Sequence, residues 1–81
     1  MTIAIEFFAG AKEFTGVSRV EMEVPNRTTV AGLRTAIAER WPRVAPLLSK
    51  STIAVNEHRA DDSTPLIDGA VVAILPPVSG G

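Results

Sequence analysis

The stretch that decides the fold is VVAILPPVSGG, residues 71–81. Val71 to Leu75 is an unbroken apolar run with the length of one buried β-strand. Pro76-Pro77 ends that strand because proline cannot donate a hydrogen bond to a neighbouring strand. A strand that is apolar on both faces belongs at the centre of a sheet, and we expect it beside the first strand and parallel to it. Val72 and Ile74 are expected to face a helix.

Residues 76–81 are predicted to form a tail, separate from a folded domain over residues 1–75. Fully extended, the six residues reach about 20 Å. The prolines favour a stiff extended start, and glycines without a Cβ fit a slot too narrow for other residues. Two interpretations stay open at this point: a tail that presents its terminal carboxylate to a partner, and a chain end without a role. The second is the usual fate of chain ends, and Gly-Gly alone does not exclude it. The tail consists of Pro76, Pro77, Val78, Ser79, Gly80 and Gly81.

Composition limits the possible functions. The chain has 81 residues, of which 46% are hydrophobic, which suits one small globular domain. Eight basic and nine acidic residues give a net charge of −1, so charge provides no reason to expect nucleic acid or a membrane as a partner. The absence of cysteine excludes disulfides, thiolate metal sites and a persulfide on this chain. No apolar run is long enough to span a bilayer, and we expect a cytoplasmic protein.

The N-terminal segment, Thr2 to Phe8, alternates like a strand. Its apolar face is Ile3, Ile5 and Phe7, whereas Glu6 marks the wetter face. Phe8 shares the face of Glu6 and is either an incidental exposed residue or part of a docking surface. With Leu75 it is predicted to form an apolar patch beside the root of the tail, where a partner would dock.

The remaining segments complete a mixed α+β pattern. Residues 18–24 alternate as a second strand, antiparallel to the first. Thr29 is the expected N-cap of the main helix, from Val30 to about Trp41, which ends before Pro42. Further expectations are one helical turn at residues 11–14, another within 44–50, a strand at 52–55 and a brief strand near Arg59. Together they predict a mixed sheet of four or five strands packed on one main helix.

The polar residues show no catalytic or metal-binding pattern. His58 is interpreted as part of a turn, since no cysteine or triad spacing accompanies it. Asp61-Asp62 lacks the glycine and terminal glutamate of a calcium loop and reads as a solvated turn. Arg34, Arg40 and Arg43, with Glu39 among them, are interpreted as ordinary solvated surface and not as an anion site. We therefore expect no catalytic residue, metal or bound cofactor in this chain.

Several stretches together resemble the small subunit of molybdopterin synthase, the MoaD-type sulfur carrier. They are FFAGAKEFTG (7–16), TVAGLRTAIAERW (29–41), AVNE (54–57), PLIDG (65–69) and ILPPVSGG (74–81). The resemblance covers essentially the whole chain and implies a ubiquitin-like β-grasp fold. The chain departs from the family at Ala70, where an acidic residue is frequent, and at Arg59, where an apolar residue can help a partner dock.

The resemblance also implies a reaction and its partners. An activating enzyme of the MoeB type, similar to ubiquitin-activating enzymes, uses ATP to adenylate the Gly81 carboxylate. A sulfur donor protein then supplies sulfur, leaving a thiocarboxylate on Gly81. The MoaE-type large subunit receives the tail in its active site, where the cyclic pyranopterin precursor gains the sulfurs of the molybdopterin dithiolene. Two carriers on a dimeric large subunit would make a heterotetramer.

The chemistry fits a carrier that depends on other proteins. A carboxylate with a pKa of about 3.5 is anionic and a poor electrophile until AMP replaces its charge. This chain has no glycine-rich phosphate-binding loop with a lysine, so ATP belongs on the activating enzyme. Three alternatives stay open: a carrier for thiamine, cysteine or tRNA thiolation, a ubiquitin-like modifier joined through Gly81 to lysines, and a plain interaction module.

Overall fold

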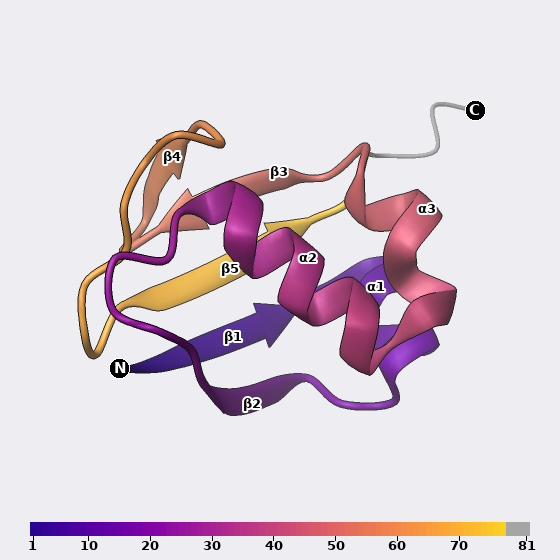
Figure 1. Ribbon diagram of the computed structural model, residues 1–81. Coiled ribbons are helices and arrows are strands. Elements are labelled where there is room, and N and C mark those ends of the chain that lie inside the picture. The colour runs from indigo at the N-terminus through magenta and orange to yellow at the C-terminus, as the bar shows by residue number, and fades with distance from the viewer. Residues whose placement is uncertain (78–81) are drawn as a thin grey trace.

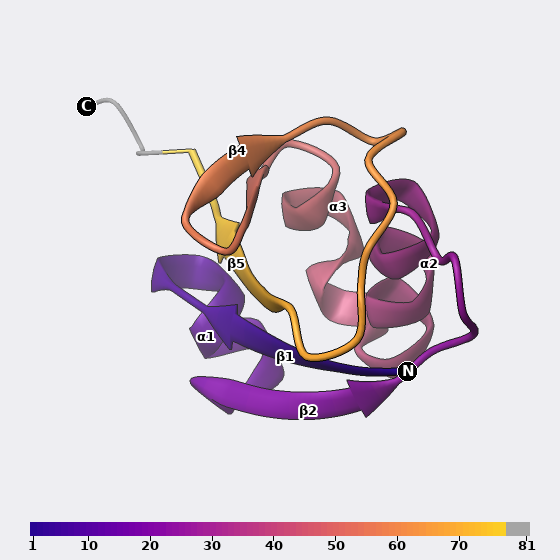
Figure 2. The ribbon, with the colours of Figure 1, turned by 90° about the vertical axis from the view of Figure 1, so that its left-hand side faces the viewer.

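The computed structural model describes residues 1–77, which form one five-stranded mixed sheet with helices packed on one face (Figure 1). Figure 2 shows α2 and α3 together on one side of the sheet. The predicted β-grasp fold is confirmed, and of the four or five strands expected the sheet has five. The elements are β1 (Thr2–Phe7), α1 (Ala9–Thr15), β2 (Arg19–Glu23), α2 (Val30–Arg40), the 3₁₀ helix η1 (Pro42–Val44), α3 (Ala45–Leu48), β3 (Thr52–Val55), β4 (His58–Ala60) and β5 (Val71–Leu75).

Strand β5 occupies the centre of the sheet. The strand order is β2-β1-β5-β3-β4, with β5 parallel to β1 and antiparallel to β3. The predictions of a central final strand and of an antiparallel first hairpin are both confirmed. A central strand has both edges paired and both faces in contact with other residues. The apolar run at 71–75, without a charged residue, meets that requirement.

Alternate residues of the strands divide the sheet into a covered face and an open face. The covered face carries the predicted apolar residues Ile3, Ile5 and Phe7 of β1 and Val72 and Ile74 of β5, all at most 2% exposed. They pack with the buried stripe of α2, which is Val30, Leu33 and Ile37. This layer between the sheet and α2 is the hydrophobic core.

Helix α2 begins at the predicted N-cap, since the Thr29 hydroxyl accepts a hydrogen bond from the Gly32 N–H at 3.2 Å. The helix ends at Arg40, one residue before the expected Trp41. Pro42 disfavours helical geometry at the residue before it, and Trp41 accordingly has a non-helical backbone. The Trp41 ring nevertheless joins the core edge-on to Phe7, with 5.2 Å between ring centroids.

The first connection differs from the sequence prediction. We expected one helical turn at residues 11–14, but α1 spans Ala9–Thr15. Strand β1 consequently ends at Phe7, and Phe8 becomes the N-cap residue of α1. Gly16 ends the helix as expected, at φ 77°, and its N–H donates to the Lys12 carbonyl at 2.9 Å. Burial of Ala11 favours the longer helix, which packs against η1 and α3.

The β3–β4 hairpin has a two-residue turn. Asn56 and Glu57 both have positive φ, 49° and 71°, and the strands pair on either side of them. His58 was expected in the turn but is the first residue of β4. Among residues 1–77, no helix is both long enough and apolar enough to cross a membrane.

Candidate partner-docking face

Strand β5 ends at Leu75, and the described part of the chain continues through Pro76 and Pro77. The rest of the predicted tail, Val78, Ser79, Gly80 and Gly81, lies outside the described residues. Insertion of residues 76–81 into a partner, and modification of Gly81, therefore stay predictions. The structure does show that Pro76 follows directly from the central strand of the sheet, so the tail is rooted in a strand that is paired on both edges.

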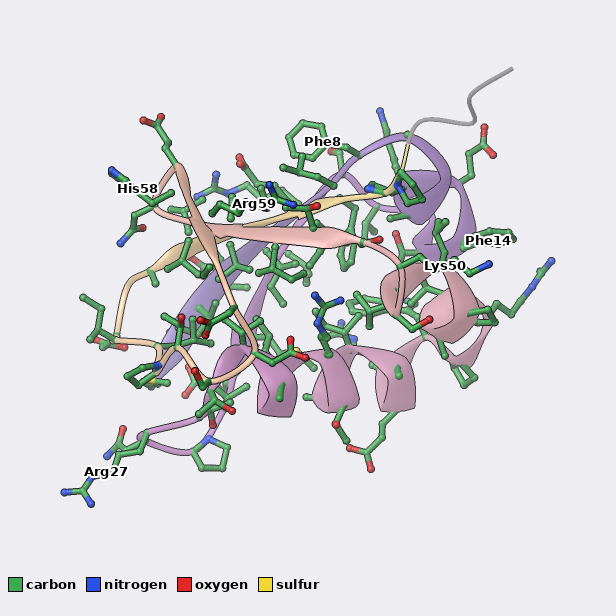
Figure 3. The ribbon with its side chains drawn as sticks, turned by 90° about the horizontal axis from the view of Figure 1, so that it is seen from above. Phe8, Phe14, Arg27, Lys50, His58 and Arg59 are labelled. Carbon is green, nitrogen blue, oxygen red and sulfur yellow. The ribbon has the colours of Figure 1, made fainter. Side chains whose placement is uncertain are left out.

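Phe8 and Leu75 lie at the same end of the sheet. Phe7 is the register partner of Ile74 in the parallel β1–β5 pair. Phe8 is the next residue after Phe7, and Leu75 is the next after Ile74. Their side chains are 45% and 38% exposed. Figure 3 shows Phe8 on the side of the sheet away from α2. The structure therefore places both predicted docking residues next to the root of the tail, and their role in binding stays a prediction.

One row of register partners crosses all five strands of the open face. It runs Arg19, Glu6, Ala73, Ala54, Arg59, from β2 to β4. The two central alanines leave a shallow floor between charged ends. At one end the Arg19 guanidinium forms an ion pair with Glu6, with 2.8 Å between nitrogen and oxygen. The other end is Arg59, whose side chain Figure 3 shows on the same side of the sheet as Phe8.

A surface depression lies beside the root of the tail. Leu75, Pro76 and Pro77 line one part of it, and Lys50, Thr52, Ala54, Glu57 and Arg59 line the rest. Sequence reasoning identified Leu75 and the prolines but did not place Lys50 and Arg59 on one depression. Lys50 lies just before β3 and Arg59 pairs with Ala54 in the middle of β3, so the pairing of β3 with β4 puts both residues on its lining. Sequence alternation in β3 could have indicated the face of Arg59. Ile53 is apolar and faces the core, so Ala54 and its register partner Arg59 face the other way.

The interpretation of Arg34 as solvated surface is wrong. Its side chain is only 23% exposed and forms an ion pair with Asp62, with 2.9 Å between Nε and Oδ1. The guanidinium also donates to the backbone carbonyl oxygens of Leu48 and Ser51, the latter at 3.0 Å. Arg34 therefore ties α2 to the end of α3 and to the loop after β4, and it binds no external anion in this arrangement.

Arg40 and Arg43 instead lie over aromatic rings. The Arg40 guanidinium carbon is 4.6 Å from the centroid of the Trp41 ring, and that of Arg43 is 5.9 Å from the Phe14 ring. Both distances are within the range of a cation–π contact. These two arginines belong to the surface around α1 and the end of α2, and the structure does not combine the three predicted arginines into one site.

The other polar candidates form local turns. The Asp61 carboxylate accepts hydrogen bonds from the Ser63 hydroxyl at 2.7 Å, the Thr64 hydroxyl at 3.1 Å and the Ser63 N–H at 3.1 Å. These bonds, that of the Ser63 hydroxyl first, hold the pKa of Asp61 below its ordinary value. The Nδ1 of His58 lies 3.2 Å from the carbonyl oxygen of Asn56. Across residues 1–77, no three His, Asp or Glu side chains are grouped as a metal site.

The strand order, the crossing helix and the tail that continues from the central strand define a ubiquitin-like β-grasp protein with one open sheet face. SAMP1 from Haloferax volcanii superposes with a TM-score of 0.89 at 22% identity, covering all of both chains, and shows the same fold. A putative molybdopterin converting factor subunit 1 from Pyrococcus furiosus superposes with a TM-score of 0.87 at 27% identity, covering 95% of this chain and 98% of that one.

Within that class, the chain belongs to the ThiS family, whose model matches residues 5–81. The molybdopterin synthase sulfur carrier subunit of Escherichia coli is 37% identical over 81 residues, covering 98% of this chain and 99% of that protein. The corresponding subunit of Arabidopsis thaliana is 30% identical over 79 residues, with 98% and 82% covered. The predicted family resemblance and β-grasp fold are therefore confirmed.

Proposed function

We propose that this chain is the sulfur carrier subunit of a molybdopterin synthase and acts in molybdenum cofactor biosynthesis. The observation that carries the proposal is nearly full-length similarity to proteins named molybdopterin synthase sulfur carrier subunit, at 26–40% identity. The geometry supports it, because a depression lined by apolar and charged residues lies beside the root of the tail, where a partner protein could dock.

The reaction takes place at the Gly81 carboxylate. The activating enzyme joins this carboxylate to the AMP part of ATP, releasing pyrophosphate. A sulfide-level sulfur nucleophile (HS⁻) delivered by the donor protein then forms a C–S bond at the acyl carbon while the C–O bond to AMP breaks and AMP leaves. AMP is a good leaving group, whereas the free carboxylate is not attacked. The product is a thiocarboxylate, an anionic sulfur nucleophile that can attack the pyranopterin precursor.

The domain contributes position, and the partners contribute catalysis. Proline at 76 and 77 restricts the backbone where the tail leaves β5, so the chain leaves the sheet in a limited range of directions. Catalytic acids and bases, ATP and a water-excluding site are assigned to the activating enzyme and the large subunit. We assign this chemistry to the cytoplasm, where both partners would act.

A solved complex supports the choice of the large subunit as partner. The complex of subunits 1 and 2 of the molybdopterin-converting factor from Helicobacter pylori contains a chain 32% identical to this one, with a TM-score of 0.72 and complete coverage of both. We therefore propose that the open face around Phe8 and Leu75 docks on a MoaE-type large subunit. The activating enzyme is proposed to be of the MoeB type.

The test is to alter only the end of the tail. Gly81→Ala, or one residue added after Gly81, should lower thiocarboxylate formation and molybdopterin synthesis by about 100-fold or more, because misplacing a reacting group is costly. Intact mass measures the exchange of oxygen for sulfur, and thermal unfolding should stay at the wild-type midpoint. Arg27→Ala, in the exposed loop between β2 and α2, is the control outside the tail. Full molybdopterin synthesis by an unprocessed extended chain would contradict the proposal.

The same samples separate the other candidates. A carrier for another thiolation pathway would acquire the thiocarboxylate but would not bind the large synthase subunit. A ubiquitin-like modifier would appear in isopeptide bonds to lysines of many proteins. A plain interaction module would lose nothing when Gly80 and Gly81 are removed.

A further inference from the structure

Arg59 and Arg27 are the two arginines that form no ion pair and no aromatic contact within residues 1–77, and of these two only Arg59 lines the depression beside the tail. Arg19 is paired with Glu6, and Arg34 is held by Asp62 and two backbone carbonyls. Within residues 1–77, no carboxylate lies within 4.0 Å of the Arg59 guanidinium, nor of the Lys50 ammonium on the same depression. At one end of the open face the charge of Arg19 is paired with that of Glu6. At the other end the Arg59 guanidinium is available to a carboxylate of a partner.

This end of the face lies within reach of whatever protein binds the tail. Residues 78–81 extend at most about 14 Å beyond Pro77, so a protein that encloses Gly81 must come close to the domain. An ordinary specific interface covers about 800 Å² on each partner. The depression lined by Pro76, Pro77 and Arg59 is next to the point where the tail leaves the sheet. Such an interface would therefore cover Arg59.

Glu57 also lines the depression, but no ion pair joins it to Arg59 among residues 1–77. Lys50 precedes β3, whose residue Thr52 pairs with Leu75 at the root of the tail. Glu57 follows β3 at the opposite end, in the hairpin turn. Arg59 pairs with Ala54 in the middle of β3 and lies between these two charges. A partner carboxylate therefore meets the Arg59 guanidinium without an ion-paired competitor.

We propose that Arg59 binds a carboxylate side chain of the large synthase subunit and thereby selects a subunit with an acidic group at that position. This inference rests on the proposed function and adds the charge of the partner surface. A guanidinium covered by an interface without a counter-charge loses hydration and gains nothing, so an uncharged partner surface would be penalised. A planar guanidinium is suited to hold a carboxylate with two parallel hydrogen bonds.

The experiment measures binding of the full-length carrier to the purified large subunit of its own organism by isothermal titration calorimetry. Arg59→Glu should raise the dissociation constant by at least about 10-fold, because it places like charges together. Arg59→Met, which keeps the length but not the charge, should raise it several-fold and flatten its dependence on salt. Arg59→Lys should bind more tightly than Arg59→Met but more weakly than wild type, since it keeps the charge and loses the two parallel hydrogen bonds.

The matched control is Arg27→Glu, which makes the same change of charge elsewhere. Arg27 is exposed in the loop between β2 and α2, and Figure 3 shows it at the opposite end of the molecule from Lys50. This variant should bind within about 2-fold of wild type, because Arg27 does not line the depression and salt screens the effect of exposed charges outside the interface. An equal loss in Arg27→Glu and Arg59→Glu would indicate a net-charge effect and would overturn the inference.

The possible failures are distinguishable. If Arg59→Glu or Arg59→Met binds as tightly as wild type, the inference is wrong while the proposed function stands. If the wild-type chain does not bind the large subunit, or never acquires a thiocarboxylate in its host, the proposed function itself is overturned and the inference with it. Thermal unfolding of each variant establishes that the fold is unchanged.

Discussion

The two faces of the sheet are built from alternate residues of the same strands, yet they have different tasks. On the covered face, Ile5, Val72 and Ile74 are completely buried. On the open face their immediate neighbours are Glu6, Ala73 and Leu75. Because successive side chains of a strand point to opposite faces, stability and binding can be changed almost independently. A substitution on the covered face should therefore lower stability, and a substitution at the next residue, on the open face, should lower binding.

Arginine gives the same contrast between the covered and open sides. Arg34 lies on the covered side, and its guanidinium is satisfied by Asp62 and backbone carbonyls. Arg59 lies on the open face without a carboxylate within 4.0 Å in the described residues. The first is therefore expected to matter for folding and the second for association. Residue type alone does not distinguish the two roles.

The largest effect is expected from the covered face of β5. Ile74→Ala should lower the free energy of unfolding by about 3–4 kcal/mol, because it removes a fully buried side chain and leaves a cavity at the centre of the sheet. Urea denaturation monitored by Trp41 fluorescence measures it. The neighbouring Leu75→Ala is the control and should cost less than about 1 kcal/mol. Similar losses in both variants would contradict the separation of the two faces.

A smaller effect is expected from Arg34. Arg34→Met keeps much of the stem but removes the ion pair with Asp62 and the bonds to two backbone carbonyls, and should cost about 1–2 kcal/mol. Arg27→Met is the control, since its side chain is exposed in a loop, and should stay within about 0.5 kcal/mol of wild type. Urea denaturation again measures the difference. If the Arg34→Met protein were as stable as wild type, the contacts of Arg34 would not contribute to stability.

Substitutions on the open face should have the smallest effect on the free energy of unfolding. They should still clearly weaken binding to the large subunit. Phe8→Ala and Leu75→Ala should each weaken binding to the large subunit by about 10-fold, which corresponds to about 1.4 kcal/mol. Both side chains are already partly exposed, so stability should fall by less than about 1 kcal/mol. Calorimetric titration measures the binding. Unchanged affinity in both variants would mean that the partner uses another surface.

Much of the fold was predictable because its signals are local. The run at residues 71–75 fixed a buried strand, Thr29 marked the start of α2, and Pro42 limited its end. The error at α1 has the opposite character. Burial of Ala11 against elements distant in sequence favours a longer helix than residues 11–14 indicate. Contacts of that kind have no signature within a short window of sequence.

The candidate site divides in the same way. The sequence pointed to Phe8 and Leu75, since each is an apolar residue at an expected exposed position. It did not reveal the contacts of Arg34, whose partners at Leu48, Ser51 and Asp62 are 14, 17 and 28 residues away. Nor did it show that Lys50 and Arg59 line one depression, because that arrangement depends on the pairing of β3 with β4.

By itself, the sequence determined the family, the apolar strand at the centre of the sheet and the glycine-ended tail that follows it. These depend on residue type and order, which act through local conformational preference and burial. Only the tertiary structure decided which charges are satisfied and which face outward together. Register and strand order bring residues far apart in sequence to one surface, and electrostatic pairing depends on distances in space.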